Sequence, residues 1–125
     1  MARILVLDDN AEIIALLRMA LEREGYQVET GRNGGEGIRL LDQTGATPDL
    51  IICNMLMPLV DGIRFLDMLR QRDEWSVIPV LMLTALTSDD TRQAAFDHGA
   101  NGFLHKPFRL SDLSSAIGSL GVRPQ

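Results

Sequence analysis

The chain has 125 residues, of which 46% are hydrophobic and 23% charged, and its formal net charge is −5. That length suits one domain with a sizeable buried core, and the composition excludes a disordered chain or one with long apolar membrane spans. Because binding to nucleic-acid phosphates depends on clustered lysines and arginines, we expect a single domain over residues 1–125 with no direct nucleic-acid or membrane partner.

The N-terminal segment and the cysteine content both indicate a cytoplasmic protein. The apolar segment that begins at Ile4 is too short for a signal peptide, and no small-residue cleavage site follows it. Cys53 is the single cysteine of the sequence, so an internal disulfide is excluded. It lies in an apolar run, where we interpret it as a small core residue without a redox role.

The first half of the chain alternates short apolar runs with segments of helical periodicity. Residues 4–7, 26–30 and 50–53 are predicted strands, and the apolar character of the first and third is typical of strands buried on both faces. Residues 11–23 and 36–43 carry apolar side chains at helical spacing and are predicted helices.

The second half continues the same alternation. Helices are predicted over residues 62–72, 88–98 and 111–120, and strands over residues 79–83 and 102–105. Trp75 falls in the loop after the first of these helices, where we expect it to be partly exposed. Five strand–helix units predict an α/β fold with a parallel, doubly wound sheet.

Polar side chains stand where the predicted strands end. Ligands of doubly wound sheets bind beyond the carboxyl ends of the strands, so these residues are the candidate functional residues. They are Asp8 and Asp9 after the first strand, Asn54 after the third, Thr84 after the fourth and Lys106 after the fifth.

Two adjacent carboxylates with loop carbonyls form a hard-oxygen site of the kind that binds Mg²⁺. A hydroxyl and an ammonium opposite them would hold the oxygens of a phosphate. Taken alone, Asp8 and Asp9 are equally well explained as a helix cap and a solvated charge.

The ordered motifs of the chain resemble the receiver domain of two-component response regulators, from Arg3 to Leu120. That likeness implies a flavodoxin-like (βα)5 sheet with strand order 2-1-3-4-5. The motifs that carry it are Ile4-Leu5-Val6-Leu7-Asp8-Asp9-Asn10, Gly25-Tyr26-Gln27-Val28, Pro48-Asp49-Leu50-Ile51-Ile52, Met57-Pro58 with Asp61-Gly62, Ile78 to Ala85, and Gly99-Ala100 leading to Lys106-Pro107-Phe108.

The resemblance also implies a metal site and a phosphate site. In the family, the positions of Asp8 and Asp9 bind Mg²⁺, and a backbone carbonyl at the position of Leu56 completes the protein ligands. The hydroxyl at Thr84 bonds to the phosphoryl group and the ammonium of Lys106 pairs with it.

A conformational switch is implied in the same way. The aromatic ring at Phe103 turns inward as Thr84 moves, which changes the face made by residues 88–98, 102–105 and 111–120. From the residues alone, Phe103 is as well explained by simple core packing. The peptide bond between Lys106 and Pro107 is commonly cis in the family.

Asn54 is the departure from the family pattern. Receiver chemistry needs a carboxylate there to attack a phosphohistidine or a small phosphodonor, and an amide oxygen is too weak a nucleophile. We therefore expect no phosphorylation at Asn54 and only weak binding of Mg²⁺. Deamidation would restore a carboxylate, but the bulky Met55 that follows makes it slow.

Three functions remain to be compared. The first is a receiver whose phosphoaccepting residue has been replaced, and the second is a pseudo-receiver that binds proteins without phosphorylation. The third, an enzyme or ligand carrier on the same fold, is weakest because the strand ends offer neither a glycine-rich phosphate loop nor a nucleophile–base pair. The expected partners are a sensor histidine kinase or phosphotransfer protein, and a downstream protein or fused output domain at the face that contains Phe103.

Overall fold

The computed structural model describes residues 2–45, 47–86 and 88–124, and the strands predicted from the sequence are all present. They form one parallel sheet in the order β2-β1-β3-β4-β5, so the predicted fold and strand order are confirmed. The strands are β1 (Arg3–Leu7), β2 (Gln27–Gly31), β3 (Leu50–Asn54), β4 (Val80–Thr84) and β5 (Gly102–His105).

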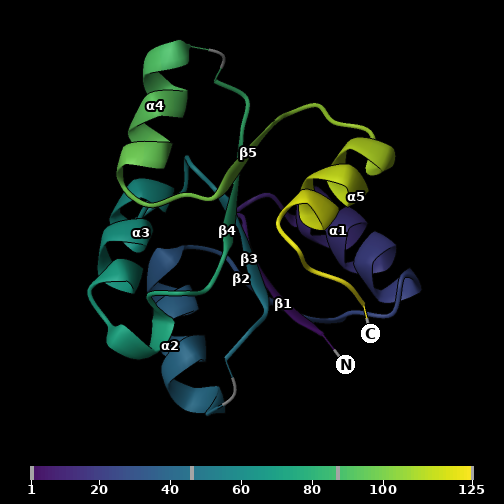
Figure 1. Cartoon of the computed structure of the whole chain (residues 1–125), viewed down its shortest axis with the longest axis horizontal. Helices are drawn as coiled ribbons and strands as arrows, with labels where there is room; N and C mark the ends of the chain where they lie inside the picture. Colours follow the sequence, from purple (N-terminus) through teal and green to yellow (C-terminus); the bar gives the residue numbers. More distant parts are fainter. Residues whose placement is uncertain (1, 46, 87, 125) are drawn as a thin grey trace.

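The helices connect successive strands and cover both faces of the sheet. In Figure 1, α2, α3 and α4 lie on one face, and α1 and α5 lie on the other. Their bounds are α1 (Ala11–Arg23), α2 (Gly34–Thr44), α3 (Gly62–Arg70), α4 (Asp89–Asp97) and α5 (Leu110–Ser119), with a 3₁₀ turn η1 (Asp73–Trp75) after α3.

Each face of the sheet packs its own apolar core. Phe65 and Leu66 of α3 are fully buried against β3 and β4, whereas Leu17 of α1 and Leu113 of α5 are buried against the opposite face. Every residue of β3 and β4 is buried. Because β3 and β4 are packed on both faces, the residues that follow them are held in fixed positions at the carboxyl edge of the sheet.

Helix α1 has the predicted bounds, and the ends of the other helices differ from the predictions by at most two residues. Helix α2 begins at Gly34, ahead of the predicted start, since the side chain of Asn33 accepts a hydrogen bond from the backbone N–H of Glu36.

Among the described residues, no helix has both the length and the apolar character that a bilayer-crossing segment requires.

The predicted partial exposure of Trp75 is wrong. The 3₁₀ turn after α3 folds the indole onto the core, where the side chain is 4% exposed. The guanidinium of Arg72 lies 4.0 Å from the ring centroid on its outer side. The sequence showed only a loop here and not the turn that directs the ring inward.

Candidate functional site

The polar residues at the strand ends converge at the carboxyl edge of the sheet. Asp8 and Asp9 follow β1, Asn54 ends β3 and Lys106 follows β5. Together with the backbone carbonyl of Leu56 they form a group of charged and polar atoms in mutual contact, which we call the strand-end cluster.

Asp8 is the buried centre of this cluster. Its side chain is 0% exposed, and its Oδ2 accepts a hydrogen bond from the ammonium of Lys106 at 2.8 Å. The other oxygen accepts from the backbone N–H of Asn10 at 2.9 Å, and Asn10 in turn caps α1. The start of α1 and the end of β5 therefore fix the same carboxylate, whereas Asp9 stays exposed.

Asn54 bridges the remaining oxygens of the cluster. Its amide nitrogen Nδ2 donates to the carbonyl oxygen of Leu56 at 2.8 Å and lies 3.4 Å from Oδ1 of Asp8 and 3.4 Å from Oδ1 of Asp9. All three neighbours are acceptors, so the network requires the nitrogen, and not the amide oxygen, to face them. The side chain is buried.

The loop between β3 and α3 brings the Leu56 carbonyl to Asn54. The backbone N–H of Gly62 bonds to the carbonyl of Met55, and a Cβ at Gly62 would stand 2.7 Å from the Asn54 carbonyl. Only glycine allows α3 to begin this close to the end of β3. The carboxylate of Asp61 caps the helix by accepting from the N–H of Arg64.

Lys106 reaches Asp8 from the loop after β5. Its backbone N–H donates to the carbonyl of Thr84 at 2.8 Å, which ties the start of this loop to the end of β4. The peptide bond between Lys106 and Pro107 is cis, as the resemblance implied. The Lys106 side chain is 17% exposed, so its ion pair with Asp8 is largely shielded from water.

Thr84 ends β4 and Phe103 lies in β5, and among the described residues neither side chain makes a hydrogen bond to the strand-end cluster. The buried Thr84 hydroxyl accepts a hydrogen bond from the backbone N–H of Leu86 at 3.0 Å. Phe103 is half-buried, with its ring edge-on to His105 and 6.5 Å from the ring of Phe96. Arg92 of α4 lies 5.9 Å from the ring centroids of both phenylalanines, a contact that the sequence reasoning missed.

Cys53 is next to Asn54 but carries no reactive thiol. It is fully buried, and this burial raises the pKa of the thiol, with a smaller contribution from the negative charge of Asp8. A thiol held protonated is a poor nucleophile and a poor metal ligand. The interpretation of Cys53 as a core residue agrees with this environment.

The cluster offers oxygens of the kind that Mg²⁺ binds, but their arrangement does not fit the ion as the side chains lie. Carboxylate oxygens of Asp8 and Asp9 and the Leu56 carbonyl surround one point, and the amide nitrogen of Asn54 is the atom directed at all three. Among the described residues, no group of three or more His, Cys, Asp or Glu side chains is placed to hold a metal ion. A bound ion would have to displace the amide.

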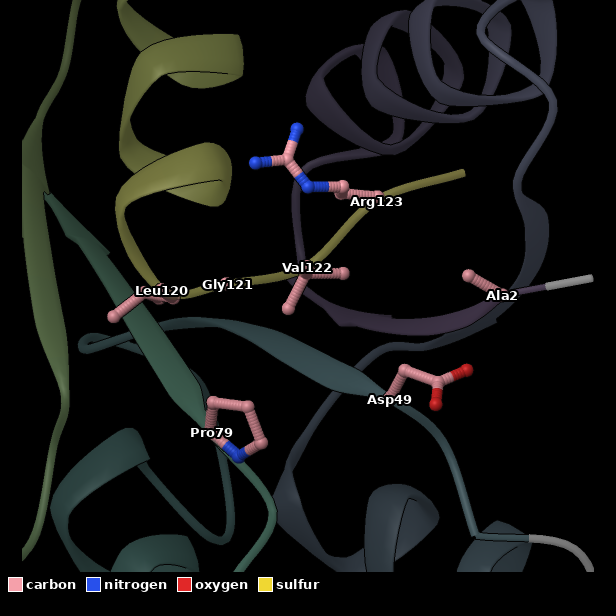
Figure 2. Close-up of a pocket in the computed structure, with 7 residues that line it drawn as sticks. All are labelled: Ala2, Asp49, Pro79, Leu120, Gly121, Val122 and Arg123. Carbon is pink, nitrogen blue, oxygen red and sulfur yellow. The ribbon is translucent and has the colours of Figure 1, made fainter. Parts of the chain in front are cut away.

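A hollow of about 510 Å³ lies at the opposite, amino edge of the sheet and takes no part in this chemistry. Figure 2 shows the Asp49 carboxylate and the Arg123 guanidinium at separate rims, with Ala2 and Val122 between them. The backbone N–H of Arg3 already donates to the Asp49 carboxylate. No candidate functional residue lines this hollow.

Comparisons with known proteins identify the family of the chain and agree with its fold. Residues 4–118 match the family described as the response regulator receiver domain. The DNA-binding dual master transcriptional regulator RpaA of Synechocystis is 38% identical over 96% of this chain and 49% of its own length. The chain spans about half the length of the curated relatives it matches.

Solved structures extend the likeness to the backbone. The chemotaxis response regulator CheY4 of Vibrio cholerae has a TM-score of 0.90 and is 32% identical, with 96% of this chain and 98% of that one covered. The signal receiver domain of a signal transduction histidine kinase from Syntrophus aciditrophicus has a TM-score of 0.88 at 34% identity, covering 100% of this chain and 95% of that one.

Proposed function

The chain belongs to the family of response regulator receiver domains of two-component systems, and from that premise we propose that Asn54 occupies its phosphoacceptor position and accepts no phosphoryl group. The observation that carries the proposal is the position of Asn54 at the end of β3, in contact with both Asp8 and Asp9. A residue there is the one that an incoming phosphodonor would meet.

The chemistry of the amide explains the block. In phosphoryl transfer to a receiver, a carboxylate oxygen attacks phosphorus as the bond from phosphorus to the donor breaks, which leaves an acyl phosphate. The amide oxygen of Asn54 carries no full charge, the nitrogen lone pair is delocalised into the carbonyl group, and the N–H groups donate hydrogen bonds. Deamidation is also opposed, because the backbone nitrogen of Met55 that would attack the amide donates to the Leu83 carbonyl.

We assign the remaining residues the roles that their chemistry supports. Asp8, Asp9 and the Leu56 carbonyl would hold Mg²⁺ weakly, and the ion would supply positive charge to phosphoryl oxygens. Lys106 would pair with those oxygens, a task for which it would exchange its present partner Asp8. Thr84 and Phe103 would form the switch, with the Thr84 hydroxyl leaving the Leu86 N–H.

The partners follow from the family. We propose that a sensor histidine kinase or phosphotransfer protein docks at the strand-end cluster, and that a downstream protein or output domain binds the face made by α4, β5 and α5. The net charge of −5 argues against direct contact of this domain with nucleic acid. A signalling module without catalytic turnover, acting in the cytoplasm, is the function most consistent with these residues.

Intact-mass spectrometry tests the proposal. Incubation with a small acyl phosphate and Mg²⁺ is expected to leave the mass of this protein unchanged, whereas Asn54→Asp gains one phosphoryl group that disappears on chelation of Mg²⁺. Asn54→Asp combined with Asp9→Asn serves as the control, and its labelling should fall sharply. Labelling of the unmodified chain at Asn54 or a neighbour would contradict the proposal.

A second function is favoured by one specific observation. The cluster already has its charges offset by the Asn54 amide and the Lys106 ammonium, so the domain could bind a partner as a phosphorylation-independent pseudo-receiver. Amide NMR spectra separate the two cases at Thr84 and Phe103. If the amide resonances of this chain at these two residues match those of phosphorylated Asn54→Asp, the chain is a pseudo-receiver held in the active state. If they match those of the unphosphorylated variant, the first function holds.

A further inference from the structure

The atoms around the Asn54 amide nitrogen are all oxygens, and two of the three belong to carboxylates. An NH₂ group has two hydrogens, and here three acceptors share them. The short 2.8 Å contact to the Leu56 carbonyl uses one hydrogen, so the other is shared between Asp8 and Asp9 at 3.4 Å each. This single nitrogen joins the β1 end, the β3 end and the loop before α3.

We propose that the side-chain amide of Asn54 replaces the divalent cation of this site, so that the domain keeps its strand-end cluster assembled without metal. The amide presents partial positive charge to the same oxygens that would otherwise approach an ion. Lys106 compensates one of the two carboxylate charges, because its ammonium is 2.8 Å from Asp8. The inference rests on the proposed function, since it assumes that these oxygens form the receiver's cation site.

Replacement of the cation by Asn54 and ligation of the cation by Asn54 predict opposite effects on Mg²⁺ binding when the side chain is removed. If the Asn54 amide oxygen were a metal ligand, as a weaker version of an aspartate, removing the side chain would weaken Mg²⁺ binding. If the amide nitrogen stands in the place of the ion, Mg²⁺ must first displace it. Removing the side chain should then strengthen Mg²⁺ binding, although it removes a polar group from the site.

Isothermal titration with Mg²⁺ compares this chain with Asn54→Ala and Asn54→Asp. We expect Asn54→Ala to bind Mg²⁺ about fivefold more tightly than this chain, the factor that corresponds to relief of one ordinary net hydrogen-bond contribution. Asn54→Asp should bind most tightly of the three. Asn33→Ala, which removes an asparagine that caps α2 away from the cluster, is the matched control and should leave Mg²⁺ affinity unchanged.

The outcomes separate the inference from the function on which it rests. Weaker binding by Asn54→Ala, together with tight binding by Asn54→Asp, overturns the cation-replacement role and leaves the receiver site intact. Absence of Mg²⁺ binding by Asn54→Asp overturns both, because the oxygens then form no cation site.

A measurement on the unmodified chain covers the case in which Asn54→Ala does not fold. The side-chain NH₂ resonances of Asn54, assigned in the ¹⁵N-labelled protein, should be shifted and slow to exchange in EDTA, and Mg²⁺ should move them only at high concentration. Resonances with the exchange rate of an exposed asparagine in EDTA would contradict the proposal.

Discussion

Two asparagines at opposite ends of the sheet perform opposite tasks. Asn54, at the carboxyl end of β3, donates to two carboxylates and a carbonyl. Asn101, ahead of β5 at the amino end, accepts from the backbone N–H of Val80 and from the guanidinium of Arg70, each at 2.9 Å. The same residue type therefore accepts hydrogen bonds that join β4 to the segment before β5 at the amino end, and donates hydrogen bonds between two carboxylates at the carboxyl end.

Two half-buried cations, Arg70 and Lys106, show the same contrast. Arg70 donates to the carbonyls of Ile78, Ser76 and Gly99, all of them neutral, and burial lowers the pKa of its guanidinium. Lys106 pairs with the carboxylate of Asp8. Arg70 and Asn101 at the amino end therefore bind uncharged backbone groups, whereas Lys106 and Asn54 at the carboxyl end balance charges that an added ion would change.

The largest expected effect is that of Lys106→Met. It leaves the fully buried Asp8 carboxylate without its ammonium, and breaking a buried pair from one side costs about 3–5 kcal/mol. We expect a loss of about 3 kcal/mol in EDTA, near the low end because Asn10 still donates to Asp8. Urea unfolding in EDTA and in millimolar Mg²⁺ measures it, and Mg²⁺ should recover part of the loss.

The control for Lys106→Met is Glu22→Gln, which breaks an exposed pair with Arg18 and should change stability by less than about 0.5 kcal/mol. If the two substitutions cost the same, the pair at Asp8 is not the shielded contact that its burial indicates.

Arg70→Met should produce a smaller loss that ions do not alter. Several buried or half-buried carbonyls lose their donor, which at typical net values amounts to about 2 kcal/mol because water can reach some of them. The loss should be equal in EDTA and in Mg²⁺, and Arg64→Met, on the exposed side of the same helix, should be near neutral. An Mg²⁺-dependent loss at Arg70 would break the contrast between the two ends.

The effect of Asn54→Asp on stability should reverse when Mg²⁺ is added. A third carboxylate adds two repulsive pairs, each worth up to roughly 3 kcal/mol at an effective dielectric of about 20 and a separation of about 5 Å. Attraction to Lys106 and screening by solvent reduce the net metal-free loss to about 1–2 kcal/mol. Calorimetry should show a lower melting temperature than this chain in EDTA and a larger upward shift with Mg²⁺. Equal melting temperatures in EDTA and equal shifts with Mg²⁺ would show that position 54 does not share a site with Asp8 and Asp9.

The fold was predictable because its signals are local. Fully apolar runs such as Leu50 to Cys53 indicate strands buried on both faces, and helical spacing indicates the segments between them. The parallel arrangement then brings the strand ends together, so the contacts among Asp8, Asn54 and Lys106 followed from topology.

The orientation of side chains was not predictable in the same way. The direction of the Asn54 amide depends on three oxygens from two loops, and no sequence pattern encodes which end of an amide faces them. The contact of Thr84 with the Leu86 N–H and the inward turn of Trp75 likewise depend on the course of irregular segments. Local propensity gives the elements, and loop geometry decides the chemistry between them.

The smallest expected change in stability concerns backbone strain, which also differs between the two ends of the sheet. Four glycines with positive φ, Gly25, Gly45, Gly99 and Gly121, follow helices at the amino end, where glycine adopts this conformation without strain. The loop at the carboxyl end instead places Leu59 at φ 67° with a side chain 83% exposed, and among the described residues it is the single non-glycine in this region.

Leu59→Asn should therefore stabilise the protein. The left-handed conformation costs a leucine about 1–2 kcal/mol, and asparagine tolerates it better because its short polar side chain bonds locally. The highly exposed leucine side chain has little packing to lose, so we expect a gain of about 0.5–1 kcal/mol, or a rise of roughly 2–5 °C in melting temperature. Leu56→Asn, an exposed leucine of the same loop without positive φ, should give no comparable gain. A rise shared by both variants would point to removal of exposed apolar surface, whereas a rise confined to Leu59→Asn places the strain in the loop that carries the Leu56 carbonyl to Asn54.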